Sequence, residues 1–489
     1  MVKDNKTDSK KSIGRDVTKL VSGTVIAQLI GICLSPIITR LFPPDIYGSA
    51  TLLISIVGFL TIICCFCYER ALIIPKKDED AGSLFVSCLL LLGVICILVS
   101  VVWIFFGELI FTLLNAQQLL PYSWLIPVLL FIDGLYLILR YWNTRKGRFG
   151  IQAITQSLQA LIGSGCKVGL GFGGIVSVGS FIIGTIIGNI TGMILIAIQI
   201  FRKDLADIRA GCSWENMKKQ LVLYKKFPMI TTWSSFVNGF AWQSPVYLLS
   251  FFFSTAVTGL YSLGFSMIQL PMSLIGASLG QVYYQRGAIA NHDGKLASLL
   301  EDIEYLLLVL SVIPICYLLV MGGDIFSFFF GQGWTEAGVY CQILSIWAFV
   351  WFLTSTTGAN TFMILGKQEK LISFHVLNCV TRISSMVIGG MFQSIYLALI
   401  LLTLSGVLSY GFLLLRICKF SGASLWKILS SASRHLLLAV MYLAFFIVCK
   451  MFLATVPVFV LLVITGLPII GYYLWLVKRD SRLREYLPI

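Results

Sequence analysis

The lysines and arginines of this chain alternate across its hydrophobic segments. Fourteen apolar stretches divide the 489 residues, and the basic residues fall almost entirely into every second gap between them. Of the 36 lysines and arginines, only four lie elsewhere: Arg40, Lys167, Arg382 and Lys450. Loops rich in lysine and arginine stay in the cytoplasm during membrane insertion. The pattern therefore predicts an even number of crossings, with both termini on the cytoplasmic side.

Composition leads to the same fold class. Hydrophobic residues make up 58% of the chain and charged residues 12%, and the mean hydropathy of +0.90 is too high for a soluble surface of this size. We predict an all-α, polytopic helical membrane protein. The net charge of +14 would suggest a nucleic-acid partner in a soluble protein, but the topology accounts for it here, so no nucleic-acid partner is expected.

A helix needs about 20 apolar residues to cross a bilayer. On that measure the sequence predicts spans near residues 17–40, 46–68, 83–107, 119–141, 151–172, 176–201, 228–253, 256–282, 303–321, 337–364, 371–391, 394–416, 434–455 and 457–477. The predicted organisation is a cytoplasmic tail (1–16), an N-lobe (17–201), a cytoplasmic linker (202–227), a C-lobe (228–416), a second linker (417–433), two further spans (434–477) and a cytoplasmic tail (478–489).

The first linker contains the segment WENMKKQLVLYKKF, which has apolar residues at helical spacing. Trp214, Met217, Leu221, Tyr224 and Phe227 would share one face of a helix, which is typical of an amphipathic helix at the membrane surface. A plain solvated loop is the alternative.

A weak internal repeat supports two similar lobes. Residues 35–55 and 244–266 each contain Ser-Pro inside one span, a glycine that opens the next span (Gly48 and Gly259), and a serine seven residues after that glycine. We expect two six-helix lobes related by a pseudo-two-fold axis along the membrane normal, with substrate handled between them.

Glycines recur every four residues in the fifth and sixth spans, at Gly165, Gly169 and Gly173 and then at Gly184, Gly188 and Gly192. This spacing lets helix backbones approach closely, and we assign these residues no chemistry. The thirteen cysteines and three histidines show no metal-binding spacing.

Three predicted spans retain a charged residue: Asp133, Lys167 and Arg382. A charge at the bilayer centre costs about 2.5 to 3.5 kcal/mol on insertion scales, and such residues usually face a protein interior or a wet cavity. The helical rise places Asp133 and Lys167 at different depths, so they are not expected to pair directly. A local salt bridge or snorkelling to the interface is the alternative for Lys167 and for Arg382.

Arg40 lies at the outer end of the first span, where Pro36 is expected to bend the helix, and its guanidinium could grip a phosphate in a bidentate manner. Local pairing with Asp45 is the alternative. Further polar candidates for contacts with a sugar lie in the first and seventh spans: Gln28, Asn238, Trp242 and Gln243. Hydrogen bonding between helices is their alternative role.

The predicted external loops are short, and the longest, residues 322–336, carries Asp324 and Glu336 but no DxD motif, histidine dyad or serine nucleophile typical of an enzyme. We therefore expect no enzymatic activity. A membrane-embedded polysaccharide polymerase or glycosyltransferase is the alternative from another class, and the short external loops argue against it.

Five segments carry a family resemblance: ITRLFPPDIYG (38–48), YERALIIPKKDEDA (68–81), YKKFPM (224–229), TGLYSLGFSMIQLPMSLIG (258–276) and QVYYQR (281–286). With these segments the chain resembles the polysaccharide transporters, or O-antigen (Wzx-type) flippases, of the multidrug/oligosaccharidyl-lipid/polysaccharide (MOP) exporter superfamily.

The resemblance implies a two-lobe transporter in the bacterial inner membrane that moves an undecaprenyl-diphosphate-linked glycan to the outer leaflet by alternating access. It implies a cationic cavity, which fits Arg40, Lys167 and Arg382, and coupling to H⁺ or Na⁺ with no other cofactor. Asp133 is then the candidate coupling carboxylate, and Glu69 and Arg70 are candidates for a gate. Membrane lipids, a polysaccharide polymerase and glycosyltransferases are the implied partners. A drug/ion antiporter is the alternative within the superfamily, although cationic residues would repel drug cations.

Overall fold

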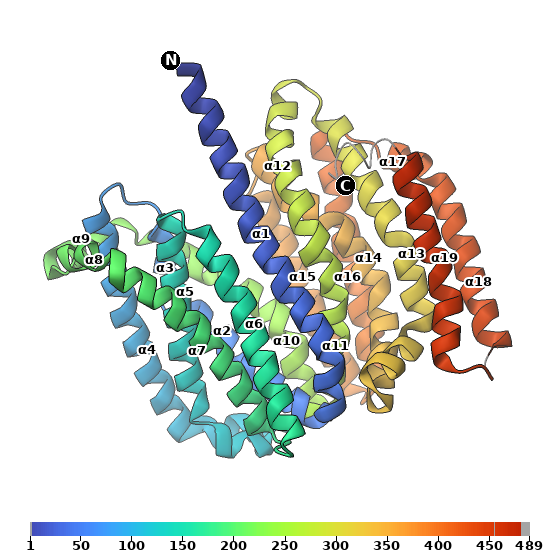
Figure 1. Ribbon diagram of the computed structural model, residues 1–489, viewed down its shortest axis with the longest axis horizontal. Coiled ribbons are helices and arrows are strands. Elements are labelled where there is room, and N and C mark those ends of the chain that lie inside the picture. Colours follow the sequence, from blue (N-terminus) through green and yellow to red (C-terminus); the bar gives the residue numbers. More distant parts are fainter. Residues whose placement is uncertain (1, 454, 481–489) are drawn as a thin grey trace. The chain divides into compact units, whose positions relative to one another are not determined.

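The computed structural model describes residues 2–453 and 455–480, with side chains from Ser22 onward except at positions 277 and 278. Every regular element in these residues is a helix, which confirms the predicted all-α class (Figure 1). The chain divides by its internal contacts into two units, with the boundary between Gly259 and Leu260. This boundary lies within a helix and not in the predicted linker 202–227.

Unit 1 contains ten α-helices and the start of an eleventh. Their bounds are α1 (Val2–Leu41), α2 (Pro44–Ile63), α3 (Tyr68–Ala71), α4 (Asp78–Leu113), α5 (Leu125–Arg145), α6 (Phe149–Phe172), α7 (Val178–Lys203), α8 (Leu205–Ala210), α9 (Trp214–Leu223) and α10 (Thr232–Phe252). A 3₁₀ helix, η1 (Gln117–Tyr122), precedes α5, and a π-helix, η2 (Phe227–Thr231), precedes α10.

Unit 2 begins inside α11 (Thr255–Pro271). It continues through the π-helix η3 (Met272–Gly276), α12 (Ala277–His292), α13 (Leu296–Phe330), the 3₁₀ helix η4 (Gln332–Trp334), α14 (Thr335–Ile364), α15 (Lys370–Met391), α16 (Ile395–Ser421), α17 (Leu425–Ser431), α18 (Ser433–Phe452) and α19 (Val458–Arg479).

Eleven helices among the described residues are long and apolar enough to cross a membrane, or up to twelve if the bent pair Thr255–Gly276 and Leu279–His292 forms one span. Each of the fourteen predicted spans overlaps a helix, but α6 and α10 are not among the eleven helices that are long and apolar enough to cross a membrane. Both carry runs of polar residues between their apolar ones. The chain is thus a multi-pass membrane protein, and the count of fourteen crossings stays a prediction.

The second predicted span, 46–68, extends too far. The helix α2 ends at Ile63. Phe66 and Cys67 have φ angles of 48° and 59°, in the left-handed region that a helix of L-residues cannot continue through. The chain therefore turns before Tyr68, which begins the short helix α3 instead of ending a span.

The two glycines aligned by the internal repeat are in contact with each other. A Cβ atom on Gly48 would lie 1.8 Å from the Thr255 carbonyl oxygen and 2.6 Å from the Gly259 nitrogen. A Cβ atom on Gly259 would lie 2.1 Å from the Pro44 carbonyl oxygen. The first turns of α2 and α11 therefore pack backbone against backbone, and only glycine fits at either position.

We expect Gly48→Ala to destabilise the protein by about 2 kcal/mol or more, because the methyl group must push α2 away from α11. Thermal unfolding of the purified protein in detergent measures the effect. Gly31→Ala is the matched control, since a Cβ at Gly31 meets nothing within 4 Å. Equal melting temperatures for the two variants would contradict the close packing.

The predicted close approach of glycines is confirmed on α7 and wrong in part on α6. A Cβ on Gly184 would lie 3.1 Å from the carbonyl oxygen of Gly163. A Cβ on Gly188 would lie 3.0 Å from the Cα atom of Gly163. Gly165 and Gly169, which the sequence pattern favoured, have nothing within 4 Å. Gly163 takes their place because it lies on the face of α6 that packs against α7.

The connection from α2 to α4 is fixed by Arg145 at the end of α5. Its guanidinium donates hydrogen bonds to the carbonyl oxygens of Leu72 and Pro75, at 3.1 and 2.6 Å, and to the Asp78 carboxylate at 2.9 and 3.1 Å. The Arg145 side chain is only 9% exposed. The segment 68–81, which is part of the family resemblance, is thus bound to α5 by the Arg145 side chain.

A second ion pair fixes the end of α7. Arg148 grips both carboxylate oxygens of Asp204, at 2.6 and 2.7 Å, and the Trp142 indole N–H donates to the same carboxylate at 3.1 Å. Burial by itself would raise the pKa of Asp204, but the hydrogen bonds from Arg148 and Trp142 outweigh it and hold that pKa below its usual value. This bidentate pair connects the start of α6 to the end of α7.

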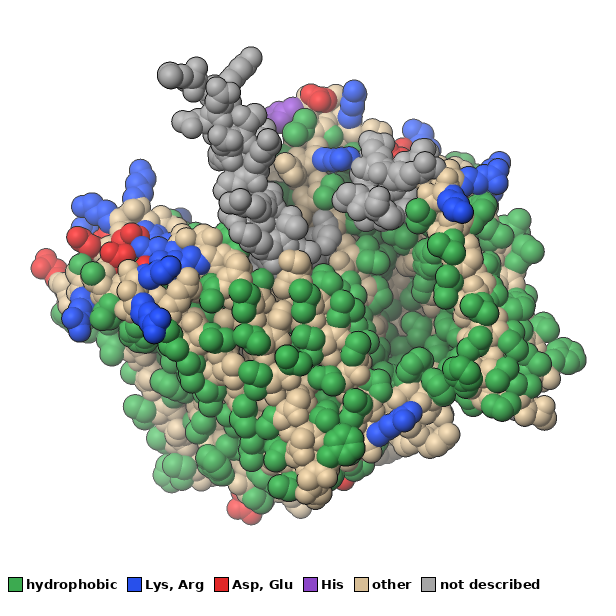
Figure 2. Space-filling view, viewed as in Figure 1, with side chains coloured by type: hydrophobic (Ala, Val, Ile, Leu, Met, Phe, Trp, Pro, Cys, Tyr) green, Lys and Arg blue, Asp and Glu red, His purple; other side chains and the backbone are tan. Residues whose placement is uncertain are grey.

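The predicted linker is helical and packs against α4. Ser83 on α4 donates to the Gly211 carbonyl oxygen at 2.7 Å and accepts a hydrogen bond from Asn216 at 2.7 Å. Tyr68 donates to the Leu221 carbonyl oxygen at 2.9 Å, and Met217 is buried. The alternative of a plain solvated loop is therefore wrong. Charged side chains gather over α8 and α9, whereas hydrophobic side chains cover the flanks of the longer helices (Figure 2).

In unit 2, α18 and α19 pack against α13 through a cluster of apolar side chains that includes Met321, Phe446 and Leu461. Lys450, one of the four basic residues outside the alternating pattern, pairs with Asp324 at 2.8 Å and donates to the Val320 carbonyl oxygen at 2.9 Å. Lys450 therefore links the last turn of α18 to α13.

Candidate functional site

Asp133 anchors a chain of hydrogen bonds inside unit 1. The carboxylate accepts a hydrogen bond of 2.7 Å from the Asn189 side-chain amide on α7. The Asn189 oxygen in turn accepts one of 2.6 Å from the Gln159 amide on α6. No lysine or arginine among the described residues forms an ion pair with Asp133. A carboxyl group is thus kept within a membrane span by neutral amides alone, which is costly and typical of a functional position.

Lys167 lies on α6 without a carboxylate partner among the described residues. Its ammonium nitrogen lies 4.1 Å from the centre of the Phe181 ring on α7, within the range of a cation–π contact. The methylene stem lies against Gly184. The local salt bridge considered from the sequence is not formed within the described part of the chain, and, as expected, Lys167 and Asp133 do not pair.

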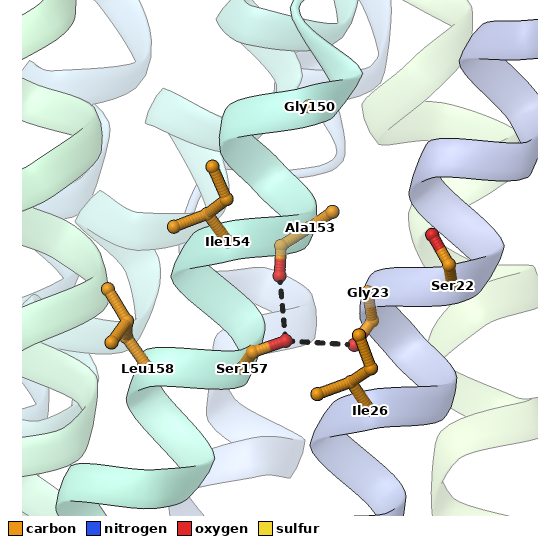
Figure 3. Close-up of a pocket in the computed structure, with 8 residues that line it drawn as sticks. All are labelled: Ser22, Gly23, Ile26, Gly150, Ala153, Ile154, Ser157 and Leu158. Atoms are coloured by element: carbon orange, nitrogen blue, oxygen red, sulfur yellow. Dashed lines mark hydrogen bonds between the residues drawn. The ribbon is translucent and has the colours of Figure 1, made fainter.

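The helices α1 and α6 border an apolar cavity of about 580 Å³ (Figure 3). Ile26, Ile154 and Leu158 line it, and Ser157 donates hydrogen bonds to the carbonyl oxygens of Ala153 and Gly23. None of the predicted site residues lines this cavity. Its apolar lining suits hydrocarbon and offers little to a polar ligand.

The other candidates in unit 1 lie outside this carboxylate network. Arg40 is exposed in the last turn of α1, near the first turn of α2, which carries Asp45. Gln28 is half-buried on α1, one turn after Thr24, which donates to Gln156 on α6 at 2.9 Å. Pro36 does not interrupt α1.

On α10, Asn238 is exposed, whereas Trp242 and Gln243 are half-buried. The Gln243 amide nitrogen would lie 3.8 Å from a Cβ on Gly58, so this side chain faces α2. Tyr247, one turn further, donates to the Ser55 carbonyl oxygen at 2.9 Å. The polar side of α10 is therefore used in part for packing against α2.

Arg382 lies deep inside unit 2. Only 1% of it is exposed, and its guanidinium carbon lies 4.8 Å from the centre of the Trp347 ring. Trp347 belongs to a stack of aromatic rings with Tyr261, Phe265 and Trp351, whose neighbouring centroids lie 5.4 to 6.1 Å apart. The Tyr410 ring is tilted against both tryptophans. In this structure the arginine is thus an interior residue that lies against an aromatic stack.

A cavity of about 350 Å³, lined in part by polar side chains, lies between α12 and α14 in unit 2. Gln281 and Tyr284 line it from α12, and Ser355, Thr356 and Asn360 line it from α14. The Asn360 amide donates to the Gly280 carbonyl oxygen at 3.1 Å. The π-helix η3 directly precedes α12, and π-turns are frequent at functional sites.

Sequence reasoning missed these residues, although two signals were present. The run TSTTGANT, residues 354–361, is unusually polar for a predicted span. The segment QVYYQR was noted only for its family resemblance. Amides, hydroxyls and a tyrosine ring around one cavity are the groups that hydrogen-bond and stack on sugars.

Glu304 on α13 was also missed. It is 1% exposed, and one carboxylate oxygen accepts a hydrogen bond of 2.6 Å from Thr357 on α14, while the other has no partner in the described structure. Close by, Tyr283 and Thr361 are hydrogen-bonded at 2.7 Å. The predicted span 303–321 placed Glu304 at a membrane boundary, so its burial could not be foreseen.

Glu69 and Arg70, the candidate gate, lie in the short helix α3. Glu69 is 4% exposed, and its carboxylate lies 3.8 Å from the half-exposed Arg70 guanidinium. Burial raises the pKa of Glu69 to about 7, against a lesser opposing effect of a backbone hydrogen bond and of Arg70. The group can therefore change its charge near neutral pH.

We expect the free energy of unfolding to fall as the pH rises from about 4.5 to about 7, because folded Glu69 holds its proton through a range in which the unfolded carboxyl has lost it. Glu69→Gln should flatten this part of the pH profile of the melting temperature. Glu79→Gln, at an exposed position on α4, is the control. An unchanged profile in Glu69→Gln would show that another group titrates.

Among the described residues, no group of three or more His, Cys, Asp and Glu side chains is arranged to hold a metal ion. The polar groups gathered inside the bundles are instead an acid, cations, amides and hydroxyls. Such residues inside spanning helices mark the paths of substrates and ions in transporters. Fold and buried polar groups together define an integral membrane protein whose helical bundles enclose ionisable and amide side chains.

Several solved structures have the same fold. The lipid II flippase MurJ in an inward closed conformation matches with a TM-score of 0.70 and 13% identity, over 93% of this chain and 98% of that chain. An inward-facing multidrug resistance MATE family transporter of the MOP superfamily matches with a TM-score of 0.62 and 12% identity, over 82% and 99%. A MATE transporter of Vibrio cholerae matches with a TM-score of 0.53 and 14% identity, over 85% of this chain and 98% of that chain.

The family is shown by the sequence itself. A family model described as polysaccharide biosynthesis protein matches residues 37–339, more than half of the chain. The chain therefore belongs to this family of polysaccharide biosynthesis proteins and has the MOP fold. No curated protein sequence matches it.

Proposed function

We propose that this protein is a flippase for a lipid-linked oligosaccharide. It moves an undecaprenyl-diphosphate-linked repeat unit of the O-antigen or another surface polysaccharide from the inner to the outer leaflet of the bacterial inner membrane, with both termini in the cytoplasm. The observation that carries the proposal is the set of charged residues kept within spans, Asp133, Lys167 and Arg382, in a chain of the polysaccharide biosynthesis family.

The charges and polar groups match the parts of such a substrate. A diphosphate is anionic, and Arg40, Lys167 and Arg382 are candidates to attract it. The cavity lined by Gln281 and Asn360 offers hydrogen bonds of the kind a sugar requires. Asp133 is the candidate for H⁺ or Na⁺ coupling, because it is a carboxyl group held in a span by neutral partners. Glu69 and Arg70, in the short helix α3 that follows α2, are candidates for a gate.

A drug/ion antiporter of the same superfamily is the competing transport function. Cationic residues within the spans disfavour drug cations by charge repulsion. A polysaccharide polymerase or glycosyltransferase is disfavoured by family membership and by the short connections opposite the basic loops. The other members of the pathway, a polymerase and glycosyltransferases, are then partners of the flippase.

Complementation of a bacterial strain that lacks its own flippase tests the proposal. Surface polysaccharide should return with the wild type, and the double variant Gln281→Ala/Asn360→Ala should restore less at equal membrane expression. Because a narrow sugar specificity can prevent complementation, purified protein in proteoliposomes should also be given a fluorescent lipid-diphosphate oligosaccharide. Failure to move any such substrate, together with export of a cationic dye, would favour the antiporter instead.

A further inference from the structure

A cavity of about 830 Å³ lies at the end of unit 2 that the basic residues assign to the cytoplasm. It is bounded by α13, by the end of α17, by the first turns of α18 and by the last turns of α19. Every element that lines it belongs to unit 2. None of the residues predicted from the sequence as a site lines it.

The wall of the cavity is rigidly built around His435. This ring is 7% exposed and lies between two hydroxyls, with Nδ1 2.9 Å from the Tyr472 oxygen and Nε2 3.3 Å from the Tyr305 oxygen. The Tyr305 hydroxyl donates a hydrogen bond of 2.7 Å to the Asp480 carboxylate. A consistent assignment has neutral His435 donating from Nε2 to Tyr305 and accepting from Tyr472 at Nδ1. The hydrogen bond from Tyr305 thus holds Asp480, the acidic residue that lines the cavity, in place.

Two arginines provide the positive charge. Arg434 lies in the first turn of α18, and Arg479 lies in the last turn of α19, with its guanidinium 5.7 Å from the Trp475 ring centre. Neither forms an ion pair within the described structure. The start of α18 has no side-chain cap, and exposed Ser431 and Ser433 add hydroxyl donors. These groups together suit an anion at a helix N-terminus.

The remaining wall is apolar and continues along α18 and α19. Leu437 is 65% exposed and Trp475 is 40% exposed, as expected of side chains that face lipid. The cavity therefore combines a polar, cationic part at the membrane surface with an apolar part toward the bilayer. A free phosphate would satisfy only the first part, whereas a phospholipid satisfies both.

The charge balance favours one type of phosphate. Among the described residues that line the cavity, Arg434 and Arg479 contribute two positive charges, Asp480 contributes one negative charge, and His435 is assigned as neutral, which leaves a net charge of about one. A phosphodiester carries a single negative charge and matches this balance. A phosphate monoester, which carries between one and two, would place an additional charge near Asp480.

We propose that this cavity binds the phosphodiester headgroup of an anionic phospholipid of the inner leaflet, with the phosphate at Arg434 and Arg479 and an acyl chain along Leu437 and Trp475. The lipid would bridge α18 and α19 at their cytoplasmic ends, where the two helices meet α13. The site is independent of the proposed transport function.

The test measures the melting temperature of the full chain in neutral detergent as phosphatidylglycerol is added. Phosphatidylcholine, inorganic phosphate and undecaprenyl phosphate are the comparison ligands. We expect phosphatidylglycerol to stabilise the wild type, and Arg434→Gln/Arg479→Gln to raise its apparent Kd about tenfold or more, since each basic residue contributes about 1 kcal/mol near a membrane surface. Lys370→Gln/Lys419→Gln removes the same charge from exposed positions elsewhere in unit 2 and should keep the wild-type Kd.

A second variant, Ser431→Glu, tests the same site without removing an arginine, and it should also weaken binding because the new carboxylate repels the phosphate. Both variants must match the wild-type melting temperature in phosphatidylcholine; if the double variant fails this condition, Ser431→Glu decides. An unchanged phosphatidylglycerol Kd in the deciding variant would overturn the proposal. Equal stabilisation by phosphatidylcholine or by inorganic phosphate would also overturn it, and so would preferential binding of undecaprenyl phosphate.

Discussion

Replacing Asp133 by asparagine is expected to reduce oligosaccharide translocation at least about tenfold while the protein stays folded. Asparagine has nearly the same shape and can still accept the hydrogen bond from Asn189 through its side-chain oxygen. What it cannot do is carry a negative charge or bind and release a proton. The amide chain from Gln159 to Asn189 would therefore remain in place without the ionisable group at its end.

The physical reason for a large effect is the cost of keeping this carboxyl group where it is. An acidic residue in a span costs about 2.5 to 3.5 kcal/mol on insertion scales, and the described structure shows no cation that offsets this cost for Asp133. A carboxyl group placed in a span without a compensating cation is expected to act in transport.

The measurement is the initial rate of uptake in proteoliposomes, with and without an imposed pH or Na⁺ gradient. Asp133→Asn should lose the response to the gradient, whereas Gln159→Leu, which removes the second hydrogen bond of the chain, should reduce the rate but keep the response. A wild-type rate and a wild-type gradient response in Asp133→Asn would show that this carboxylate does not couple transport.

Arg145→Ala is expected to lower the free energy of unfolding by about 3 kcal/mol. The substitution removes hydrogen bonds to the carbonyl oxygens of Leu72 and Pro75 and leaves the buried connection without its donor. It also breaks the pair with Asp78, which retains Lys146 at 2.9 Å as a second partner. The loss should therefore come more from the carbonyl groups than from the ion pair.

Arg145→Lys and Asp78→Asn separate these contributions. Lysine keeps the charge but cannot reach several acceptors in a fixed fork, so it should recover only a small part of the loss. Asp78→Asn should cost about 1 kcal/mol or less, because this carboxylate is 45% exposed. Arg140→Ala, on the same helix, is the control, and thermal unfolding measures all four variants. An Arg145→Ala melting temperature equal to that of the Arg140→Ala control would show that the Arg145 hydrogen bonds do not stabilise the connection between α2 and α4.

Several site residues could be predicted because a charged residue within an apolar segment is unfavourable for membrane insertion and is easily recognised in the sequence. Asp133 and Lys167 are conspicuous in apolar segments, and the structure shows both without an ion-pair partner in its described part. Glu304 escaped notice because it lies near the start of a helix that is 35 residues long, where an acidic residue is not unusual. Its burial depends on α14, which no local pattern reveals.

The cavity between α12 and α14 was hidden for a similar reason. Hydroxyl residues are common in membrane helices, where they bond to their own backbone. Thr356 and Asn360 become part of a cavity only because they lie opposite Gln281 on another helix. Conversely, Gly165 and Gly169 had the expected spacing, yet they lie on the wrong face of α6.

By itself the sequence determined the all-α membrane fold, the approximate position of nearly every helix and the family, since insertion into a bilayer depends on local hydrophobicity and on the charge of loops. Only the tertiary structure decided which polar residues meet. Asp133 meets Asn189, Arg145 meets the connection to α4, and His435 meets Tyr305 and Tyr472. These are contacts between helices, and their energies depend on distances that no single segment fixes.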